Sequence, residues 1–76
     1  MKVVEAIKTF IDTTNEKEIL LQDFLTFVGY IYFDSTGKEL TEKEIRITMW
    51  KLIDEEVLVL TSDRKIKEGI NYDASV

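Results

Sequence analysis

Residues Thr41 to Ile70 have the clearest structural pattern in the sequence and read TEKEIRITMWKLIDEEVLVLTSDRKIKEGI. Its first half has the pattern of a capped amphipathic helix, and its second half has the pattern of a two-stranded hairpin with a charged turn. Two strands alone are only marginally stable in water. The rest of the chain is therefore expected to supply a third strand.

The helix of this stretch is expected over about 42–55. Thr41 and Glu44 have the spacing of a capping box, in which the threonine hydroxyl accepts from the Glu44 amide and the Glu44 carboxylate reaches back. Acidic residues in the first turn also suit the helix dipole. Apolar side chains that recur at helical spacing predict one buried face: Ile45, Met49, Leu52 and Ile53. Three acids at 54–56 oppose the dipole at the other end and predict that the helix stops there.

The hairpin is expected over about 57–61 and 65–70, with a turn between them. The first strand is β-branched and aliphatic, and the second alternates, so that Ile66 points inward while Lys65 and Lys67 point outward. Residues 17–20 are the candidate third strand. An alternative remains open here, because Asn15 could instead cap a helix with Glu18 as its reciprocal partner.

Two further helices are expected in the N-terminal half, over about 2–13 and 21–33. Val4, Ile7 and Ile11 recur at helical spacing in the first. Gly29 lies inside the second and costs about 1 kcal/mol relative to alanine, which suggests close approach by another element, with the side chain of Trp50 as the candidate. A turn at 34–38 follows, where Gly37 can adopt positive φ. Residues 71–76 are polar and expected to be frayed.

The second helix is apolar around most of its circumference, which implies burial on more than one side or an exposed contact patch. Its aromatic residues include Phe27, Tyr30 and Phe33. One interpretation is a small core filled with rings. The other is an aromatic surface that binds a partner, with Trp50 beside it.

Composition excludes several classes of function. The chain of 76 residues has no cysteine, histidine or proline, so it lacks disulfides, thiolate metal sites and the commonest general base. No carboxylate or hydroxyl lies in a catalytic or metal-binding motif, and neither an enzyme nor a cofactor is expected. The net charge of −5 disfavours general nucleic-acid binding. No apolar run reaches the roughly 20 residues that span a bilayer, and residues 1–8 do not resemble a signal peptide. We expect a cytoplasmic location without membrane contact.

The order of these elements resembles the winged-helix superfamily, a helix-turn-helix followed by a β-hairpin wing. The resemblance is strongest over 41–70, where IRITMWKLIDEEVLVLT, residues 45–61, looks like the third helix and first wing strand of such domains. In the family an acidic pair at this helix end is usually followed by glycine, and this chain has Glu56 at that position. The resemblance implies one small α+β winged-helix domain spanning residues 1–76, with three helices, a hairpin wing and a possible short strand at 17–20.

Two functions remain open, because winged-helix domains serve as DNA readers, RNA binders and protein-docking modules. The first is a non-enzymatic protein-interaction or regulatory module that contacts another protein, or a second copy of itself, through Phe27, Tyr30, Phe33 and Trp50. The second is a DNA-binding transcriptional regulator that is expected to act as a dimer. Its contacts would come from the basic residues of the third helix and the wing, which are Lys43, Arg46, Lys51, Arg64, Lys65 and Lys67.

Charge favours the first function. Residues 41–56 hold three basic side chains against five acidic ones. Residues 63–67 hold three basic side chains against one acidic, so the wing is the only positive cluster. A wing of this size neutralises few phosphates, and its lysines are equally explained as a solvated strand edge that resists unwanted pairing.

Overall fold

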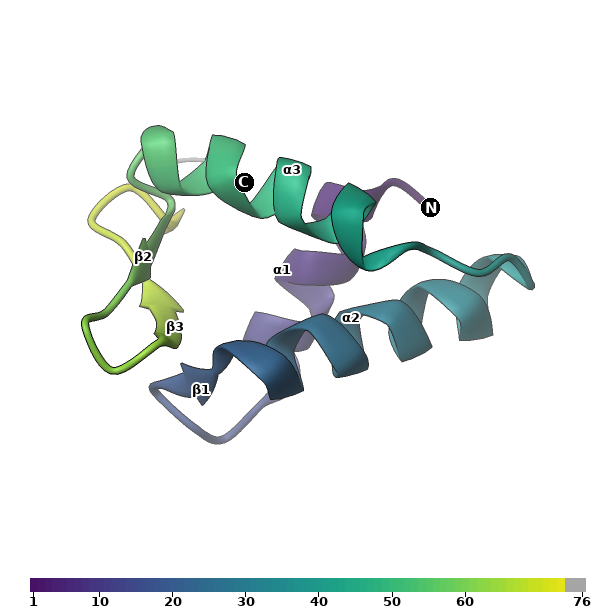
Figure 1. Ribbon diagram of the computed structural model, residues 1–76, viewed down its shortest axis with the longest axis horizontal. Coiled ribbons are helices and arrows are strands. Elements are labelled where there is room, and N and C mark those ends of the chain that lie inside the picture. The colour runs from purple at the N-terminus through teal and green to yellow at the C-terminus, as the bar shows by residue number, and fades with distance from the viewer. Residues whose placement is uncertain (74–76) are drawn as a thin grey trace.

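Residues 1–73 are described by the computed structural model, and they form three helices and one three-stranded antiparallel sheet (Figure 1). The elements follow in the order α1 (Val3–Thr13), β1 (Ile19–Leu20), α2 (Leu21–Thr36), α3 (Glu42–Asp54), β2 (Leu58–Leu60) and β3 (Lys65–Glu68). This layout confirms the predicted α+β fold with its winged-helix-like order of elements.

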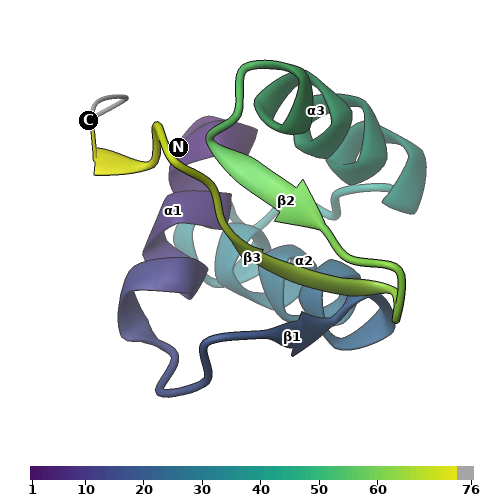
Figure 2. The ribbon, with the colours of Figure 1, turned by 90° about the vertical axis from the view of Figure 1, so that its left-hand side faces the viewer.

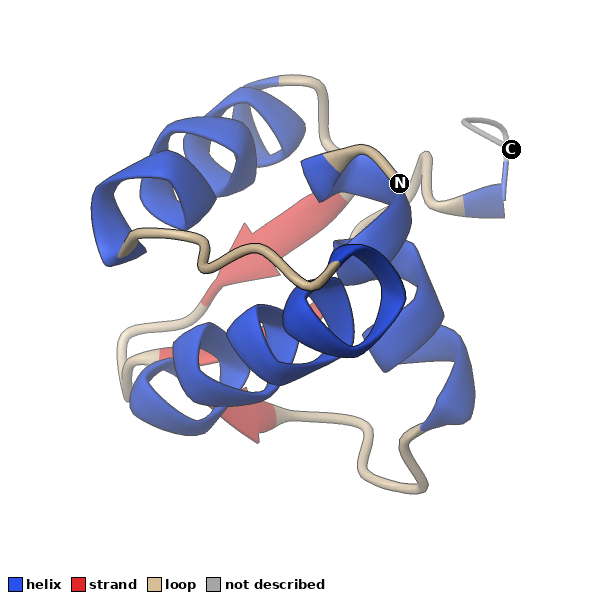
Figure 3. Ribbon diagram, turned by 90° about the vertical axis from the view of Figure 1, so that its right-hand side faces the viewer, coloured by secondary structure: helices blue, strands red, loops and turns tan. Residues whose placement is uncertain are grey.

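The sheet lies at one end of the three helices. Figure 2 looks at that end and shows β3 between β2 and β1, while Figure 3 looks from the opposite side, where the helices stand in front. β3 pairs with both neighbours, so that Ile66 lies opposite Ile19 on one side and Leu60 on the other. The candidate third strand is therefore present, and it is shorter than predicted, because only residues 19–20 pair with β3.

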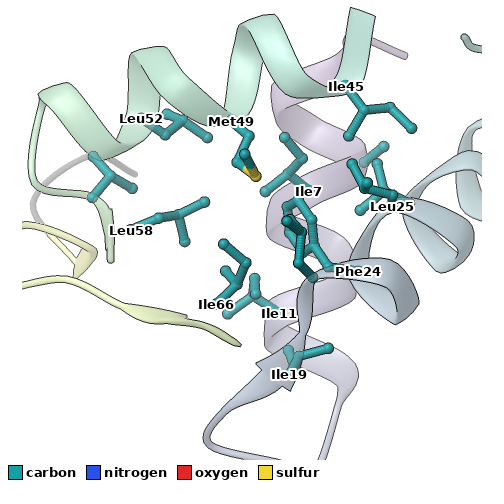
Figure 4. Close-up of a cluster of buried hydrophobic side chains, with 14 of the residues drawn as sticks. Ile7, Ile11, Ile19, Phe24, Leu25, Ile45, Met49, Leu52, Leu58 and Ile66 are labelled. Atoms are coloured by element: carbon teal, nitrogen blue, oxygen red, sulfur yellow. The ribbon is translucent and has the colours of Figure 1, made fainter. Parts of the chain in front are cut away.

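The core forms where the helices meet the sheet (Figure 4). α1 packs against both α2 and α3 and supplies Ile7, while α2 supplies Phe24. Met49 and Ile45 come from the predicted buried face of α3, and Ile66 comes from β3. All five side chains are fully buried, as the helical and alternating spacings predicted for most of them.

Both ends of α3 are closed by local hydrogen bonds. At the start, the Glu44 amide donates to Thr41 Oγ1 over 3.2 Å and the Thr41 amide donates to the Glu44 carboxylate over 3.2 Å, which confirms the predicted capping box. At the end, the Val57 amide donates to the Leu52 carbonyl and the Glu56 amide to the Ile53 carbonyl. These two bonds make a Schellman motif, which needs positive φ at Glu56, and φ there is 62°.

α2 extends to Thr36, three residues beyond the predicted end at residue 33. The polar run 34–36 was predicted to be part of a turn, yet it is helical, and the Thr36 hydroxyl donates to the Tyr32 carbonyl over 2.8 Å. The helix stops at Gly37, which adopts a φ of 72° and donates its amide to the Phe33 carbonyl. The prediction of positive φ at Gly37 is therefore confirmed.

The neighbour predicted for Gly29 was wrong. A methyl group placed on Gly29 would meet the Ile45 side chain at 3.9 Å, an ordinary van der Waals distance, and would not meet Trp50. Ile45 faces α2 because it belongs to the buried side of α3, whereas Trp50 lies off that side.

The expectation that residues 71–76 are frayed was wrong for its first part, and residues 74–76 lie outside the described residues. The Asn71 amide donates to the Glu56 carbonyl over 3.0 Å, and Tyr72 is only 6% exposed. The Tyr72 hydroxyl donates to Asp12 Oδ1 on α1 over 2.7 Å. Burial, followed by the hydrogen bond to Asp12, raises the pKa of Tyr72 well above its usual range.

Gly69 makes this C-terminal path possible. Its amide donates to the Val57 carbonyl over 2.8 Å, which brings the two backbones together. A Cβ at this position would collide with the carbonyl oxygen of Glu56. Residues 69–72 therefore pack across the junction of α3 and β2 and deliver the Tyr72 ring to α1.

Candidate protein-interaction surface

Three aromatic side chains of α2 are exposed, and we call Phe27, Tyr30 and Phe33 together the aromatic face. They are 46%, 63% and 50% exposed, respectively. Their spacing of three residues makes each one a neighbour of the next on the helix surface. The structure therefore brings together three of the four side chains that the sequence proposed for a protein contact.

Ring contacts hold part of this face in place. The Phe27 ring stacks on Phe10 of α1, with 5.7 Å between ring centroids and 21° between ring planes. Tyr30 meets the Phe27 ring edge-on at 6.1 Å. Such pairs favour defined geometries, so contacts within the chain fix the positions of the Phe27 and Tyr30 rings.

A groove lies beside the aromatic face, between α2 and the segment that leads into α3. We call it the α2–α3 groove, and its volume is about 470 Å³. Tyr30 and Phe33 contribute to its wall, and Leu40 comes from the segment before α3. The remaining lining residues are Gln22, Leu25, Thr26, Gly29, Glu39 and Glu42.

A second hollow of about 280 Å³ lies at the opposite side of the aromatic face. It is lined by Phe27, Phe10 and Ile19, and by four polar residues, which are Thr13, Thr14, Glu16 and Asp23. The charged residues that line the two hollows are all acidic. α2 itself carries two aspartates and no basic residue. The aromatic face thus lies in a region of negative charge.

Trp50, the fourth predicted contact residue, lies on α3 and is 50% exposed. Glu42, Arg46 and Trp50 are four residues apart in turn, so they follow one side of α3. Glu42 lines the α2–α3 groove, and Trp50 lies two turns, about 12 Å, further along the helix. Trp50 is therefore exposed on α3 and is not part of the groove.

Ile47 was missed by the sequence reasoning. It is 60% exposed on α3, three residues before Trp50, and the two side chains are neighbours on the outer surface. The signal was present in the sequence, because Ile47 falls outside the buried spacing of Ile45, Met49 and Leu52. A single exposed apolar residue is common, but Ile47 and Trp50 together make a pair of exposed apolar neighbours on α3.

The basic residues proposed for DNA contact occupy two elements. On α3, Lys43 and Lys51 are exposed, while the Arg46 guanidinium is held by Glu42 through Nε at 3.0 Å and Nη2 at 2.8 Å. That ion pair joins residues i and i+4 at the helix surface and contributes about 0.3–0.5 kcal/mol. It also offsets the charge of Arg46.

The hairpin carries the other three proposed residues. Arg64 and Lys67 are exposed and Lys65 is half-buried. Arg64 has a φ of 61°, and its carbonyl accepts from the Leu21 amide over 2.9 Å, which ties the hairpin turn to the start of α2. The Arg64 side chain remains exposed beside this contact.

Within residues 1–73, no helix is long and apolar enough to cross a membrane, and no three acidic side chains lie close enough together to hold a metal ion. Compared with protein-family models, curated proteins and solved structures, the chain matches none. The function must therefore be inferred from the side chains that the fold exposes.

Proposed function

We propose that the protein is a non-enzymatic interaction module on a winged-helix scaffold, which binds another protein through the aromatic face and so acts as an adaptor or regulator. The observation that carries this proposal is the exposure of Phe27, Tyr30 and Phe33 along one helix. Aromatic residues are enriched where proteins meet, because they offer a large contact area at low conformational cost.

The apolar area of the aromatic face determines how much further contact a stable complex requires. An aromatic side chain can bury about 150–250 Å², so covering the exposed half of each ring removes roughly 100 Å² from water. At about 25 cal/mol per Å², three rings contribute about 7 kcal/mol. Association itself costs about 4–15 kcal/mol. A lasting complex therefore needs further contacts, which the α2–α3 groove and Trp50 are placed to provide.

DNA binding is the second candidate, and the exposed cations of the hairpin are the observation that favours it. The acidic excess over 41–56 and the Arg46–Glu42 ion pair weaken it. A titration with mixed duplex DNA at about 50 mM salt tests it, because phosphate contacts are strong at low salt. Saturable binding that Lys67→Glu abolishes would favour this second function over the first.

Site-specific photo-crosslinking tests the protein-interaction proposal. A benzophenone amino acid replaces Tyr30 or Phe33 in one pair of variants and the exposed Ile70 or Ser62 in a control pair, and each is irradiated in cells of the source organism. We expect the same heavier adduct from both α2 positions and from neither control position. No adduct from α2, or the same adducts from all four positions, would contradict the proposal.

Self-association is distinguished by mass in the same experiment. An adduct of twice the mass of the chain identifies a second copy as the partner. Sedimentation of the unmodified protein then has to show a dimer that Tyr30→Ala weakens.

A further inference from the structure

The glycine in the wall of the α2–α3 groove is not required by the packing of the helices. A methyl group on Gly29 would meet only the end of the Ile45 side chain, at 3.9 Å, which is ordinary contact. Gly29 also lies inside α2, where alanine is the better helix former. What glycine provides at this position is open space in the groove, next to Tyr30 and Phe33.

The charged residues that line the groove are all negative. Glu39 and Glu42 line it, and no lysine or arginine is among its lining residues. Glu42 uses Oε1 to hold Arg46, whereas Glu39 has no ion-pair partner within residues 1–73. An occupant with positive charge therefore complements the rim, and an acidic occupant is repelled.

The aromatic wall narrows the choice among cations. Tyr30 and Phe33 are at least half exposed and line the groove together with these two glutamates. Arginine suits such a site, because its planar guanidinium stacks on an aromatic ring and pairs with a carboxylate at the same time. Lysine, a compact and strongly hydrated charge, makes the ion pair with less stacking.

We infer that the α2–α3 groove accepts an arginine side chain from a partner protein, carried on a segment that also presents an apolar residue to Leu25 and Leu40. This inference rests on the proposed function and names the chemistry of the partner. The guanidinium stacks on Tyr30 or Phe33 and pairs with Glu39, and the apolar residue enters the space that Gly29 leaves open.

The test uses short synthetic peptides and amide chemical shifts of the full chain. The probe is a capped, alanine-based peptide of about 14 residues, long enough to be partly helical, with two leucines and two arginines each spaced four residues apart. Matched peptides carry lysine or glutamate in place of arginine. We expect saturable shifts at Gly29, Thr26 and Leu40 with the arginine peptide, weaker ones with lysine and none with glutamate.

Variants of the protein test whether the peptide binds in the groove. Glu39→Gln is expected to weaken binding by up to about fivefold, as for an exposed ion pair. Gly29→Ala is expected to weaken binding at least as much while the fold becomes more stable, so that a loss of affinity cannot be attributed to unfolding. Ser62→Ala is the control, because Ser62 is an exposed residue between β2 and β3 that does not line this groove, and it should leave the affinity for the peptide unchanged.

Three results would overturn the inference: no shifts with the arginine peptide at millimolar concentration, equal shifts with the glutamate peptide, or unchanged affinity in Gly29→Ala. If crosslinking at position 30 still captures a partner in that case, the proposed function stands and only the arginine-binding groove is rejected. If crosslinking also fails, both are rejected.

Discussion

Glu56→Gly is expected to stabilise the protein, because Glu56 occupies a backbone conformation that favours glycine. Its φ of 62° lies in the left-handed region, and it is the residue that follows the C-cap in the Schellman motif of α3. A side chain with a Cβ costs about 1–2 kcal/mol there. Within residues 1–73 the Glu56 carboxylate makes no ion pair, so little is lost on truncation.

The net gain is smaller than the strain that is removed. Glycine destabilises the folded state by about 0.5–1 kcal/mol, because the unfolded chain gains backbone entropy. Removing a carboxylate from the negative end of the helix dipole stabilises the folded state by about 0.3–1 kcal/mol. The expected increase in the free energy of unfolding is therefore about 1 kcal/mol, which corresponds to a rise in Tm of about 4–8 °C for a chain of this size.

Urea titration followed by circular dichroism measures this change, and two further variants divide it. Glu56→Ala removes the charge and keeps the Cβ, so it should recover only the dipole contribution. Glu56→Asn should fall between alanine and glycine, because asparagine tolerates the left-handed region. If Glu56→Gly is no more stable than Glu56→Ala, the reasoning from backbone strain is refuted.

Three other substitutions test the packing. Gly29→Ala should raise the free energy of unfolding by about 1 kcal/mol in a thermal melt; a loss of stability would show that the Ile45 contact is tighter than 3.9 Å implies. Gly69→Ala should cost about 1–3 kcal/mol by overpacking against the Glu56 carbonyl, and a neutral effect would mean that this backbone approach is dispensable. Tyr72→Phe should cost about 1 kcal/mol through the lost hydrogen bond to Asp12. Because folding raises the pKa of Tyr72, the stability that its protonated hydroxyl contributes is complete below the unfolded pKa of 10.0 and is lost as the pH rises above that value. The loss of stability at alkaline pH should therefore be smaller in Tyr72→Phe than in the unmodified protein. An unchanged pH profile would count against the burial of this hydroxyl.

Local patterns in the sequence predicted the framework of the fold. The Thr41–Glu44 capping box is formed by residues three apart, and the alternation around Ile66 reflects one strand. Such signals can be interpreted without knowing what packs against them. The same holds for Gly37, whose left-handed conformation ends α2.

The features that the sequence did not predict depend on distant partners. Tyr72 is buried because it reaches Asp12, 60 residues earlier in the chain, and no local pattern marks that contact. The sequence analysis predicted Trp50 as the neighbour of Gly29, whereas the structure has Ile45 there. The rotation of α3 relative to α2 decides which side chain faces Gly29, and that rotation is set by tertiary packing. The sequence analysis left two interpretations open for Phe27, Tyr30 and Phe33, burial in the core or exposure. An apolar helix can face a core or a partner, and only tertiary packing decides between them.

Crosslinking from position 30 tests whether the aromatic face of α2 is where this protein binds another protein. The prediction is a single adduct in cells that also forms from position 33, and that does not form from the exposed position 70. If irradiation of the position 30 variant gives no adduct while the protein is folded and abundant, α2 is not the contact surface.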